Sequence, residues 1–268
     1  MSFTVIIPAR YASSRLPGKI LKDIHGQTML ERVYRGVKKS SARSIIIATD
    51  DQRIIDEAQR IGADVCLTST AHESGTQRLS EVVLQRDIAE ESIIVNVQGD
   101  EPFLPASCIE QVANLLIEDT QAEMATLCTP LLDKDDIFDR NVVKVITNHK
   151  DYAMYFSRAP IPWNRDQWNR DQWSGDEYRN GNESATHIPQ QNTYRHIGLY
   201  AYRARFIQTY VNYPACSLEQ MEKLEQLRAL WYGHNIKVAQ AIDVPGPGID
   251  SEADLIAAKA LVMEQEQG

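Results

Sequence analysis

FTVIIPARYASSRLPGK, residues 3–19, joins an apolar run to a basic loop. The run 3–7 is rich in β-branched and aromatic residues, which favours a buried β-strand. Pro8 follows the run and has no N–H group to donate to a neighbouring strand. The stretch therefore predicts a strand that ends near Pro8 and a loop that starts at its carboxyl end.

Apolar runs and amphipathic segments alternate through the first half of the chain. Further buried strands are predicted at 44–48, 64–67 and 92–97, and helices at 28–39, 51–61, 76–85 and 105–117. Ser107 and Glu110 are spaced as a capping box for the last of these helices. Such alternation is typical of βαβ units. The predicted fold class is therefore α/β, a mostly parallel sheet with helices on both faces.

The second half of the chain is less regular. Strands are predicted at 124–129, 142–147, 194–203 and 237–242, and helices at 217–231 and 252–264. Ser217 with Gln220, and Ser251, are the predicted helix caps. Residues 164–192 form a variable polar insert that contains NRDQW twice, at 164–168 and 169–173. No linker divides the chain, so we expect one domain over residues 1–268, with the insert as a surface excursion.

Composition excludes several classes of protein. Hydrophobic residues make up 43% and charged residues 24% of the 268, which is ordinary for a soluble globular enzyme. The formal net charge of −9 argues against nucleic-acid binding. No apolar run has the length of a membrane span, and the N-terminus lacks the pattern of a signal peptide. We therefore expect a cytoplasmic protein with no membrane partner.

The four cysteines, at 66, 108, 128 and 216, form no CxxC pair. Wide spacing of this kind favours reduced thiols over a zinc site or disulfide bonds.

The loop after the first strand concentrates positive charge in an acidic chain. Arg10, Arg15, Lys19 and Lys22 all occur before the first acidic residue. Open α/β sheets bind ligands at the carboxyl ends of their strands, and guanidinium and ammonium groups suit a polyphosphate. The loop matches neither a Walker A motif nor a GxGxxG motif. It predicts a phosphate site, with a solvated basic turn as the alternative.

Two aspartates are candidate metal ligands. Asp100 and Gln98 lie in VNVQGDEP, residues 95–102, directly after a predicted strand. Mg²⁺ takes one or two protein carboxylates and completes its shell with water and phosphate oxygens. Asp250, after the segment PGPGI, is a second candidate. A turn or cap role for Asp100 and a helix-entry role for Asp250 are the alternatives.

Three further segments carry polar candidates. In HESGTQR, residues 72–78, Gly75 precedes a helix whose N-terminal N–H groups suit an anion, and the HExxH spacing of a zinc site is absent. An ordinary helix start is the alternative for this segment. Glu222 and Gln226 share a face of the helix 217–231, where a solvated acidic face is the default. Arg158 and His196 stand beside aromatic segments, and a residue of either kind taken singly is more often structural.

Together these segments resemble one family, the 3-deoxy-manno-octulosonate cytidylyltransferases. The matching stretches are IPARYASSRLPGK at 7–19, ATDD at 48–51, HESGTQR at 72–78, VNVQGDEP at 95–102, YFSRAPIPW at 155–163, RHIGLYAYR at 195–203, LEQLRALWYG at 224–233 and GIDSEADL at 248–255. They run in the family's order over nearly the whole chain. The departure is the duplication within 164–192, where the family is usually shorter.

The resemblance implies a fold, a reaction and partners. The fold is a Rossmann-like nucleotidyltransferase with a protruding insert used in dimerisation. The anomeric hydroxyl of the eight-carbon sugar acid attacks the α-phosphate of CTP, and pyrophosphate leaves. The product is the activated sugar of lipopolysaccharide biosynthesis. Mg²⁺ is the implied cofactor, and a homodimer is the implied assembly.

The resemblance also assigns roles to residues. Arg15, Lys19 and Asp100 are the implied catalytic residues, and Asp100 and Asp250 the implied Mg²⁺ ligands. The implied nucleotide-binding residues are Pro8, Ala9, Arg10, Arg15, Lys19, Ser74, Gly75, Arg78 and Gln98. The implied sugar-binding residues are Gln98, Arg158, His196, Tyr200, Glu222 and Gln226, with Arg158 as the partner of the sugar carboxylate.

Alternatives stay open at this point. The same chemistry on the 8-amino-3,8-dideoxy analogue, or on another 2-ulosonic acid such as a sialic acid, changes only the acceptor. A uridylyl- or guanylyltransferase would share the basic loop but not HESGTQR and RHIGLYAYR together. A non-catalytic sugar-nucleotide-binding regulator predicts the loss of Asp100 or Lys19, and both are present.

Overall fold

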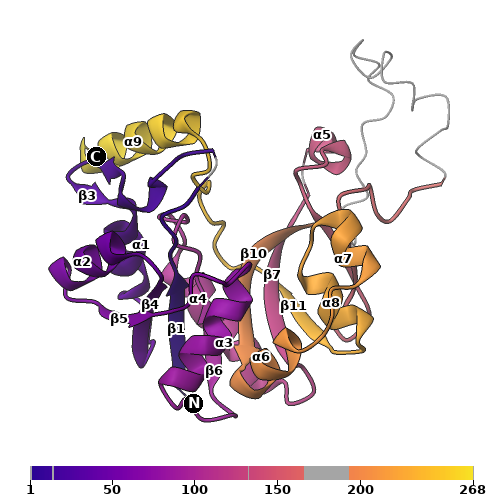
Figure 1. The fold of residues 1–268 in the computed structure, drawn as a ribbon. Coiled ribbons are helices and arrows are strands. Elements are labelled where there is room, and N and C mark those ends of the chain that lie inside the picture. Colours follow the sequence, from indigo (N-terminus) through magenta and orange to yellow (C-terminus); the bar gives the residue numbers. More distant parts are fainter. Residues whose placement is uncertain (1, 14, 132, 166–192, 268) are drawn as a thin grey trace. The chain divides into compact units, whose positions relative to one another are not determined.

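A computed structural model describes residues 2–13, 15–131, 133–165 and 193–267 (Figure 1). The chain forms two compact units. The first unit comprises Met1–Ala125, Leu199–Pro214 and Ala241–Gly268, and the second comprises Thr126–Gly198 and Ala215–Gln240. Most of the predicted insert, residues 166–192, lies outside the described residues. The expectation of a single domain stays a prediction.

The first unit contains the predicted parallel strands. They are β1 (Phe3–Pro8), β4 (Ser44–Thr49), β5 (Asp64–Leu67) and β6 (Ile93–Asn96). Their order is β6-β1-β4-β5, and Ile6 of β1 pairs with Ile46 on one side and Asn96 on the other. The last residues of β10 (Tyr194–Arg203) run antiparallel to β6. The α/β class with a mostly parallel sheet is confirmed, because apolar runs buried on both faces formed the strands.

The helices of the first unit pack on this sheet, on one another or on a short two-stranded ribbon. They are α1 (Met29–Val37), α2 (Gln52–Arg60), α3 (Gly75–Gln85), α4 (Ala106–Glu118), α6 (Ala204–Val211) and α9 (Glu252–Gln267). Helix α3 contacts β1, β4 and α6, and α4 contacts β6 and α1. The elements that were not predicted are α6, the short 3-10 helix η1 (Lys19–Leu21) and the ribbon of β2 (Asp23–Ile24) and β3 (Gln27–Thr28). These ribbon strands and η1 are too short to show a hydrophobic period.

The second unit is built on antiparallel pairing. Its elements are β7 (Met124–Pro130, which starts in the first unit), α5 (Lys134–Phe138), β8 (Lys144–Thr147), β9 (Ala153–Ser157), the start of β10, α7 (Ser217–Glu222), α8 (Gln226–Trp231) and β11 (Ile236–Gln240). Strand β8 pairs antiparallel with both β9 and β10. Helix α8 packs on β9 and also contacts α7. The two helices and the β8–β9 pair therefore lie together in this unit.

The predicted helix 217–231 is wrong as a single helix. Lys223 adopts φ 55° and ψ 46°, so the helix stops and α8 starts again at Gln226. The free carbonyl of Glu222 at this break accepts a hydrogen bond from Arg158 Nε at 2.8 Å. The predicted cap is also wrong, because Cys216 is the N-cap and its sulfur accepts the N–H of Glu219. The hydrophobic periodicity of the sequence continues past Lys223, but the helix ends there, where Arg158 binds the carbonyl of Glu222.

The two remaining caps had different outcomes. The capping box at Ser107 is wrong, since α4 has Pro105 as N-cap and Ser107 Oγ instead donates to Asp243 at 2.5 Å. The cap at Ser251 is confirmed, because its Oγ accepts the N–H of Asp254 at 3.2 Å. The N-cap of α4 thus lies two residues before the predicted one, within the range over which helix ends vary.

Candidate functional site

Apolar packing in the first unit brings the basic loop and the Asp250 loop together. Leu16 of the basic loop and Ile249 share one buried cluster with Ile24, Met29, Leu255, Ala258 and Val262. Their neighbours in sequence, Arg15 and Asp250, form an ion pair at 2.9 Å. Burial of these apolar side chains therefore holds the two loops together, and Arg15 and Asp250 lie beside the apolar cluster.

Lys19 stands at the centre of a group of carboxylates. Its Nζ lies 2.5 Å from Asp100 Oδ2 and 2.9 Å from Asp250 Oδ1, and it donates to the carbonyl of Ile249 at 3.2 Å. Only 12% of the lysine side chain is exposed. Burial favours the neutral amine, but the hydrogen bonds and charges of the two aspartates raise the pKa of Lys19 above its ordinary value. The amine is therefore a fixed cation that two carboxylates share.

Glu101 adds a third carboxyl group that the sequence reading did not single out. Burial, followed by the charges of Asp100 and Asp250, raises the pKa of Glu101 to about 7. Burial is the larger cause of this shift, and the two neighbouring carboxylates add to it. Glu101 is therefore a third acidic group close to Asp100 and Asp250.

The turn that carries Asp100 packs tightly over the end of β1. A Cβ atom at Gly99 would lie 3.2 Å from the carbonyl oxygen of Pro8 and 3.0 Å from Cδ1 of Ile20. Glycine is therefore the residue that fits this approach. Next to it, the N–H of Ala9 donates to the carbonyl of Ala48 at 2.8 Å, so this N–H group is already bound.

Helix α3 begins beside β1, as the sequence predicts for HESGTQR. Ser74 is the N-cap, and its Oγ accepts the N–H of Gln77 at 3.3 Å. A Cβ atom at Gly75, the first helical residue, would lie 3.7 Å from Cγ of Pro8, an ordinary contact. The helix N-terminus therefore lies against the end of the strand from which the basic loop emerges.

Arg78 is buried and bound to protein groups. Its guanidinium pairs with Asp50 at 2.9 Å and donates to Thr68 Oγ1. Asp50 belongs to the ATDD stretch, directly after β4. Asp50 is not among the predicted site residues, although its position at the end of a strand is a signal that could have found it. The pair ties α3 to the edge of the sheet.

A second polar cluster, in the second unit, surrounds Arg158. Glu222 accepts hydrogen bonds from Ser157 Oγ at 2.6 Å and from the backbone N–H of Arg158 at 3.0 Å. The guanidinium of Arg158 donates from Nε to the carbonyl of Glu222 at 2.8 Å and from Nη1 to the carbonyl of Arg140 at 2.9 Å. The structure thus joins Arg158 and Glu222, two residues that the sequence reading had selected separately.

His196 lies in apolar surroundings in the same unit. Its ring meets Phe156 edge-on at 5.0 Å, and Nε2 is 3.0 Å from Thr126 Oγ1. Burial lowers the pKa of His196 to about 3, so the imidazole is neutral at neutral pH. Gln226, the first residue of α8, is also buried. Its Nε2 has no hydrogen-bond partner among the described residues.

The predicted site residues divide between the two units. All the residues selected for nucleotide and metal, together with Gln98 and Tyr200, belong to the first unit. Tyr200 lies opposite Asn96 in the sheet. Arg158, His196, Glu222 and Gln226 belong to the second unit. Arg10 is exposed, and no hydrogen bond or ion pair joins it to the described residues.

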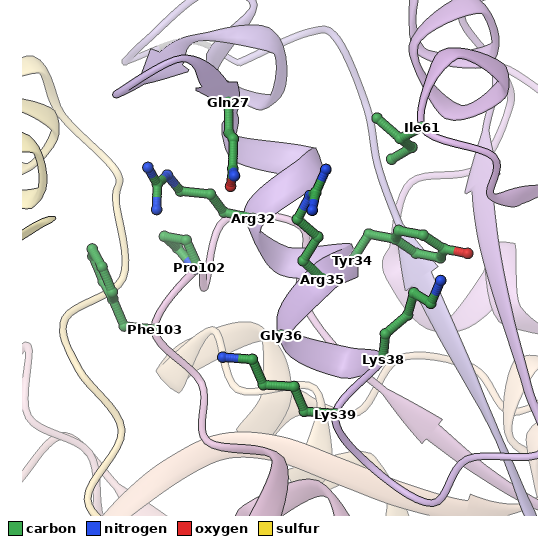
Figure 2. Close-up of a pocket in the computed structure, with 10 residues that line it drawn as sticks. All are labelled: Gln27, Arg32, Tyr34, Arg35, Gly36, Lys38, Lys39, Ile61, Pro102 and Phe103. Atoms are coloured by element: carbon green, nitrogen blue, oxygen red, sulfur yellow. The ribbon is translucent and has the colours of Figure 1, made fainter. Parts of the chain in front are cut away.

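A cavity of about 620 Å³ opens on α1 of the first unit (Figure 2). Its lining is basic, with Arg32, Arg35, Lys38 and Lys39, and it includes Pro102 and Phe103. Figure 2 shows the two arginines extending from α1 and the two lysines extending from the chain directly after it. The lining includes none of the residues that the sequence reading selected. It is a basic groove distinct from the Lys19 cluster.

Several broad expectations can be compared with the described part of the chain. The four cysteines are free thiols and are buried. Within the described residues, no three His, Cys, Asp or Glu side chains gather into a metal-binding group. Among the helices described, none is both long and apolar enough to cross a bilayer.

Comparisons with known proteins agree with one another. Residues 4–236 match the family model described as cytidylyltransferase. The chain is 49% identical to the 3-deoxy-manno-octulosonate cytidylyltransferase of Idiomarina loihiensis, over 97% of this chain and 98% of the relative. It is 48% identical to the enzyme of that name from Nitrosococcus oceani, over 100% and 99%.

Solved structures give the same picture. The structure of CMP:2-keto-3-deoxy-manno-octonic acid synthetase complexed with CTP is similar, with a TM-score of 0.85 and 34% identity, over 99% of this chain and 100% of that one. A 4-diphosphocytidyl-2C-methyl-D-erythritol synthase from Anaerococcus prevotii is similar in fold alone, with a TM-score of 0.58 and 16% identity, over 98% and 96%.

Proposed function

Because the chain belongs to the 3-deoxy-manno-octulosonate cytidylyltransferase family, we propose that it transfers CMP from CTP to the anomeric hydroxyl of 3-deoxy-manno-octulosonate. The hydroxyl oxygen bonds to the α-phosphorus, the bond to the bridging oxygen breaks, and pyrophosphate leaves as the hydroxyl proton is lost. The product would be the activated sugar for lipopolysaccharide biosynthesis. The observation that carries the proposal is the cluster in which Asp100 and Asp250 converge on Lys19.

The basic loop would hold the triphosphate. Arg10 and Arg15 are exposed, and Arg15 forms an ion pair with Asp250 at 2.9 Å. Phosphoryl transfer depends mainly on positioning and charge neutralisation. We propose that Arg10, Arg15 and Lys19 neutralise the phosphates. Pro8, Ala9, Ser74, Gly75, Arg78 and Gln98 would surround the rest of the nucleotide.

The two aspartates fit a magnesium ion. Both already direct oxygens at a single cation, the ammonium of Lys19, at 2.5 and 2.9 Å. Their side chains are 30% and 49% exposed, so a hydrated ion can reach them. Hard carboxylate oxygens, completed by water and phosphate, are the ligands that Mg²⁺ prefers. We propose that Asp100 and Asp250 hold it, where its charge would stabilise the phosphates and lower the pKa of the attacking hydroxyl.

The residues that the resemblance implies for the sugar acid differ in the groups that they offer. Arg158 would pair with the sugar carboxylate, since a guanidinium binds a carboxylate through parallel hydrogen bonds. Neutral His196, Tyr200, Gln98 and Gln226 supply groups for hydroxyls. The carboxylate of Glu222 is already bound to Ser157 and Arg158, so we propose that Glu222 supports sugar binding through Arg158.

We propose in addition a homodimer in the cytoplasm, where CTP is available, with the insert 164–192 at the interface. Sedimentation of the full chain and of a chain shortened in the insert tests the assembly. A dimer that persists unchanged after shortening would remove the insert from the interface.

The test of the activity is pyrophosphate release from CTP. The acceptors are 3-deoxy-manno-octulosonate and, separately, its 8-amino analogue, each with and without Mg²⁺. Metal-dependent release with the hydroxyl sugar is expected. Release only with the amino sugar would keep the mechanism and change the acceptor. Release with neither acceptor would contradict the proposal and favour a non-catalytic binder.

A further inference from the structure

Lys144 is a fully buried lysine that the proposed chemistry leaves unused. It is 0% exposed and lies at the start of β8. Its Nζ donates to three carbonyl oxygens, those of Asp139 at 2.9 Å, Val142 at 2.6 Å and Arg158 at 2.8 Å. An ammonium has three donors, so these bonds use all of them. A buried charge is costly unless it is fully bonded, which makes this placement specific rather than incidental.

Arg158 is held from the opposite side by a carboxylate. Its backbone N–H donates to Glu222 Oε2 at 3.0 Å, while its backbone carbonyl accepts from Lys144. Ser157 Oγ donates to the other oxygen of Glu222 and accepts the N–H of Ala159 at 3.0 Å. The backbone donor and acceptor of one residue are therefore both bound to charged side chains. Charge-assisted hydrogen bonds are the stronger kind, so the end of β9 is held firmly.

The same lysine also fixes a second support of the guanidinium. The carbonyls of Asp139 and Val142 flank Arg140, whose own carbonyl accepts from Arg158 Nη1 at 2.9 Å. Lys144 thus bonds to the turn 139–142 and to Arg158 at once. Nε and Nη1 of Arg158 are bound to backbone, and no hydrogen bond joins Nη2 to the described residues. Nη2 is left for an external carboxylate.

We propose that Lys144 is a positioning residue that orients Arg158 toward the carboxylate of the sugar acid. The inference rests on the proposed function, in which Arg158 binds that carboxylate. A flexible arginine would lose side-chain entropy on binding, and a frame that fixes it in advance removes much of that cost. No uncharged side chain places three donors at the end of a four-carbon stem, which is why a lysine suits this position.

The first experiment uses Lys144→Met in the full chain, with steady-state pyrophosphate release as the readout. Methionine keeps the apolar stem and removes the three donors. We expect KM for the sugar acid to rise about tenfold or more, the effect of about 1.4 kcal/mol, with KM for CTP within about twofold. Lys237→Met is the matched control, because Lys237 also donates to a carbonyl in the second unit, that of Lys150 at 2.7 Å. It should leave both constants near the wild-type values.

A second readout separates positioning from general damage. The acceptor is compared with its carboxamide, which lacks the negative charge. The wild-type enzyme should prefer the acid, and Lys144→Met should lose most of that preference. A purely structural lysine would lower activity on both acceptors equally, and an unchanged preference would overturn the inference. Lys144→Arg, which keeps the charge and several donors, should keep more of the preference than methionine, and it serves alone if Lys144→Met does not fold.

The two proposals fail in different ways. If the wild-type enzyme releases no pyrophosphate with the sugar acid, the proposed function is wrong. If the wild type prefers the acid and the Lys144 variants prefer it equally, only the role of Lys144 is wrong.

Discussion

The Lys19 cluster of the first unit and the Arg158 frame of the second unit use charge in opposite ways. In the first, Lys19 and Arg15 are bound to carboxylate side chains, which the proposed metal and triphosphate would take over. In the second, the backbone N–H and carbonyl of Arg158 are bound to Glu222 and Lys144, and its Nε is bound to a backbone carbonyl. On the proposed function, the ion pairs of the cluster would exchange when substrate binds, whereas the frame around Arg158 is formed beforehand.

The largest expected effect breaks the first cluster. Asp100→Asn removes a proposed metal ligand and one of the charges that holds Lys19. We expect kcat to fall about 10²- to 10³-fold, which is the typical effect of removing one preorganised group that stabilises charge in the transition state of an enzyme. Pyrophosphate release at saturating CTP and Mg²⁺ measures it. Asp243→Asn, an exposed aspartate bonded to Ser107, is the control and should retain activity. Retained activity in Asp100→Asn would remove Asp100 from the catalytic group.

The next prediction sharpens the comparison with one substitution in each unit. Arg158→Lys loses charge-assisted hydrogen bonds worth roughly 1.5–3 kcal/mol, so KM for the sugar acid should rise about 10- to 100-fold. Arg15→Lys keeps the charge of a side chain that is 68% exposed, so KM for CTP should change by about threefold or less. Steady-state kinetics with each substrate varied in turn measures both. An equal rise in the two KM values would contradict the difference that we infer between the two arginines.

His196 predicts a pH dependence of stability. Its pKa is about 3 in the folded protein against an ordinary value of 6.5, so the unfolded chain binds a proton that the folded chain excludes. The neutral imidazole therefore imposes no cost on folding above pH 6.5, and the free energy of unfolding declines as the pH falls from 6.5 toward 3. Between pH 7.5 and 5 it should lower the free energy of unfolding by about 2 kcal/mol. Urea unfolding at both pH values measures it.

The control for this prediction is His196→Gln, which cannot titrate. Its free energy of unfolding should fall less than that of the wild type over the same pH interval. An equal fall in both proteins would assign the pH dependence to other groups.

The smallest expected effect concerns the cap of α9. Ser251 Oγ accepts the N–H of Asp254, and Asp254 in turn accepts the N–H groups of Asp250 and Ser251. Ser251→Ala should lower the free energy of unfolding by about 1 kcal/mol. It should also raise the Mg²⁺ concentration needed for half-maximal rate, because the Asp250 loop loses a support. Thermal unfolding and a Mg²⁺ titration test the two parts separately.

Local patterns predicted the elements that depend on burial alone. The strands β5 and β10 have the predicted bounds, since apolar and β-branched runs report the residues that a sheet buries. Caps and breaks were less predictable. Cys216 caps α7 one residue before the expected serine, and α7 stops at Lys223 where Arg158 bonds the free carbonyl of Glu222.

The candidate site also combines features that the sequence predicts with features that it does not. Arg15, Lys19 and Asp100 follow strands of the first unit, so their convergence followed from the rule that parallel strands end at one edge. The pairing of Arg78 with Asp50 did not, because it depends on where α3 sits against the sheet. Nor could Lys144 be recognised, since a lysine in a strand is usually exposed.

The sequence by itself determined the parallel α/β core, the basic loop at the end of β1 and the family to which the chain is similar. Each of these depends on residue type and spacing along one segment. The tertiary structure alone decided that Asp100 and Asp250 share Lys19, that Glu101 is hard to ionise, and that Lys144 and Glu222 hold Arg158 between them. These features depend on distances between segments far apart in the chain. Electrostatic and hydrogen-bond energies are set by such distances and by burial, which no single segment contains.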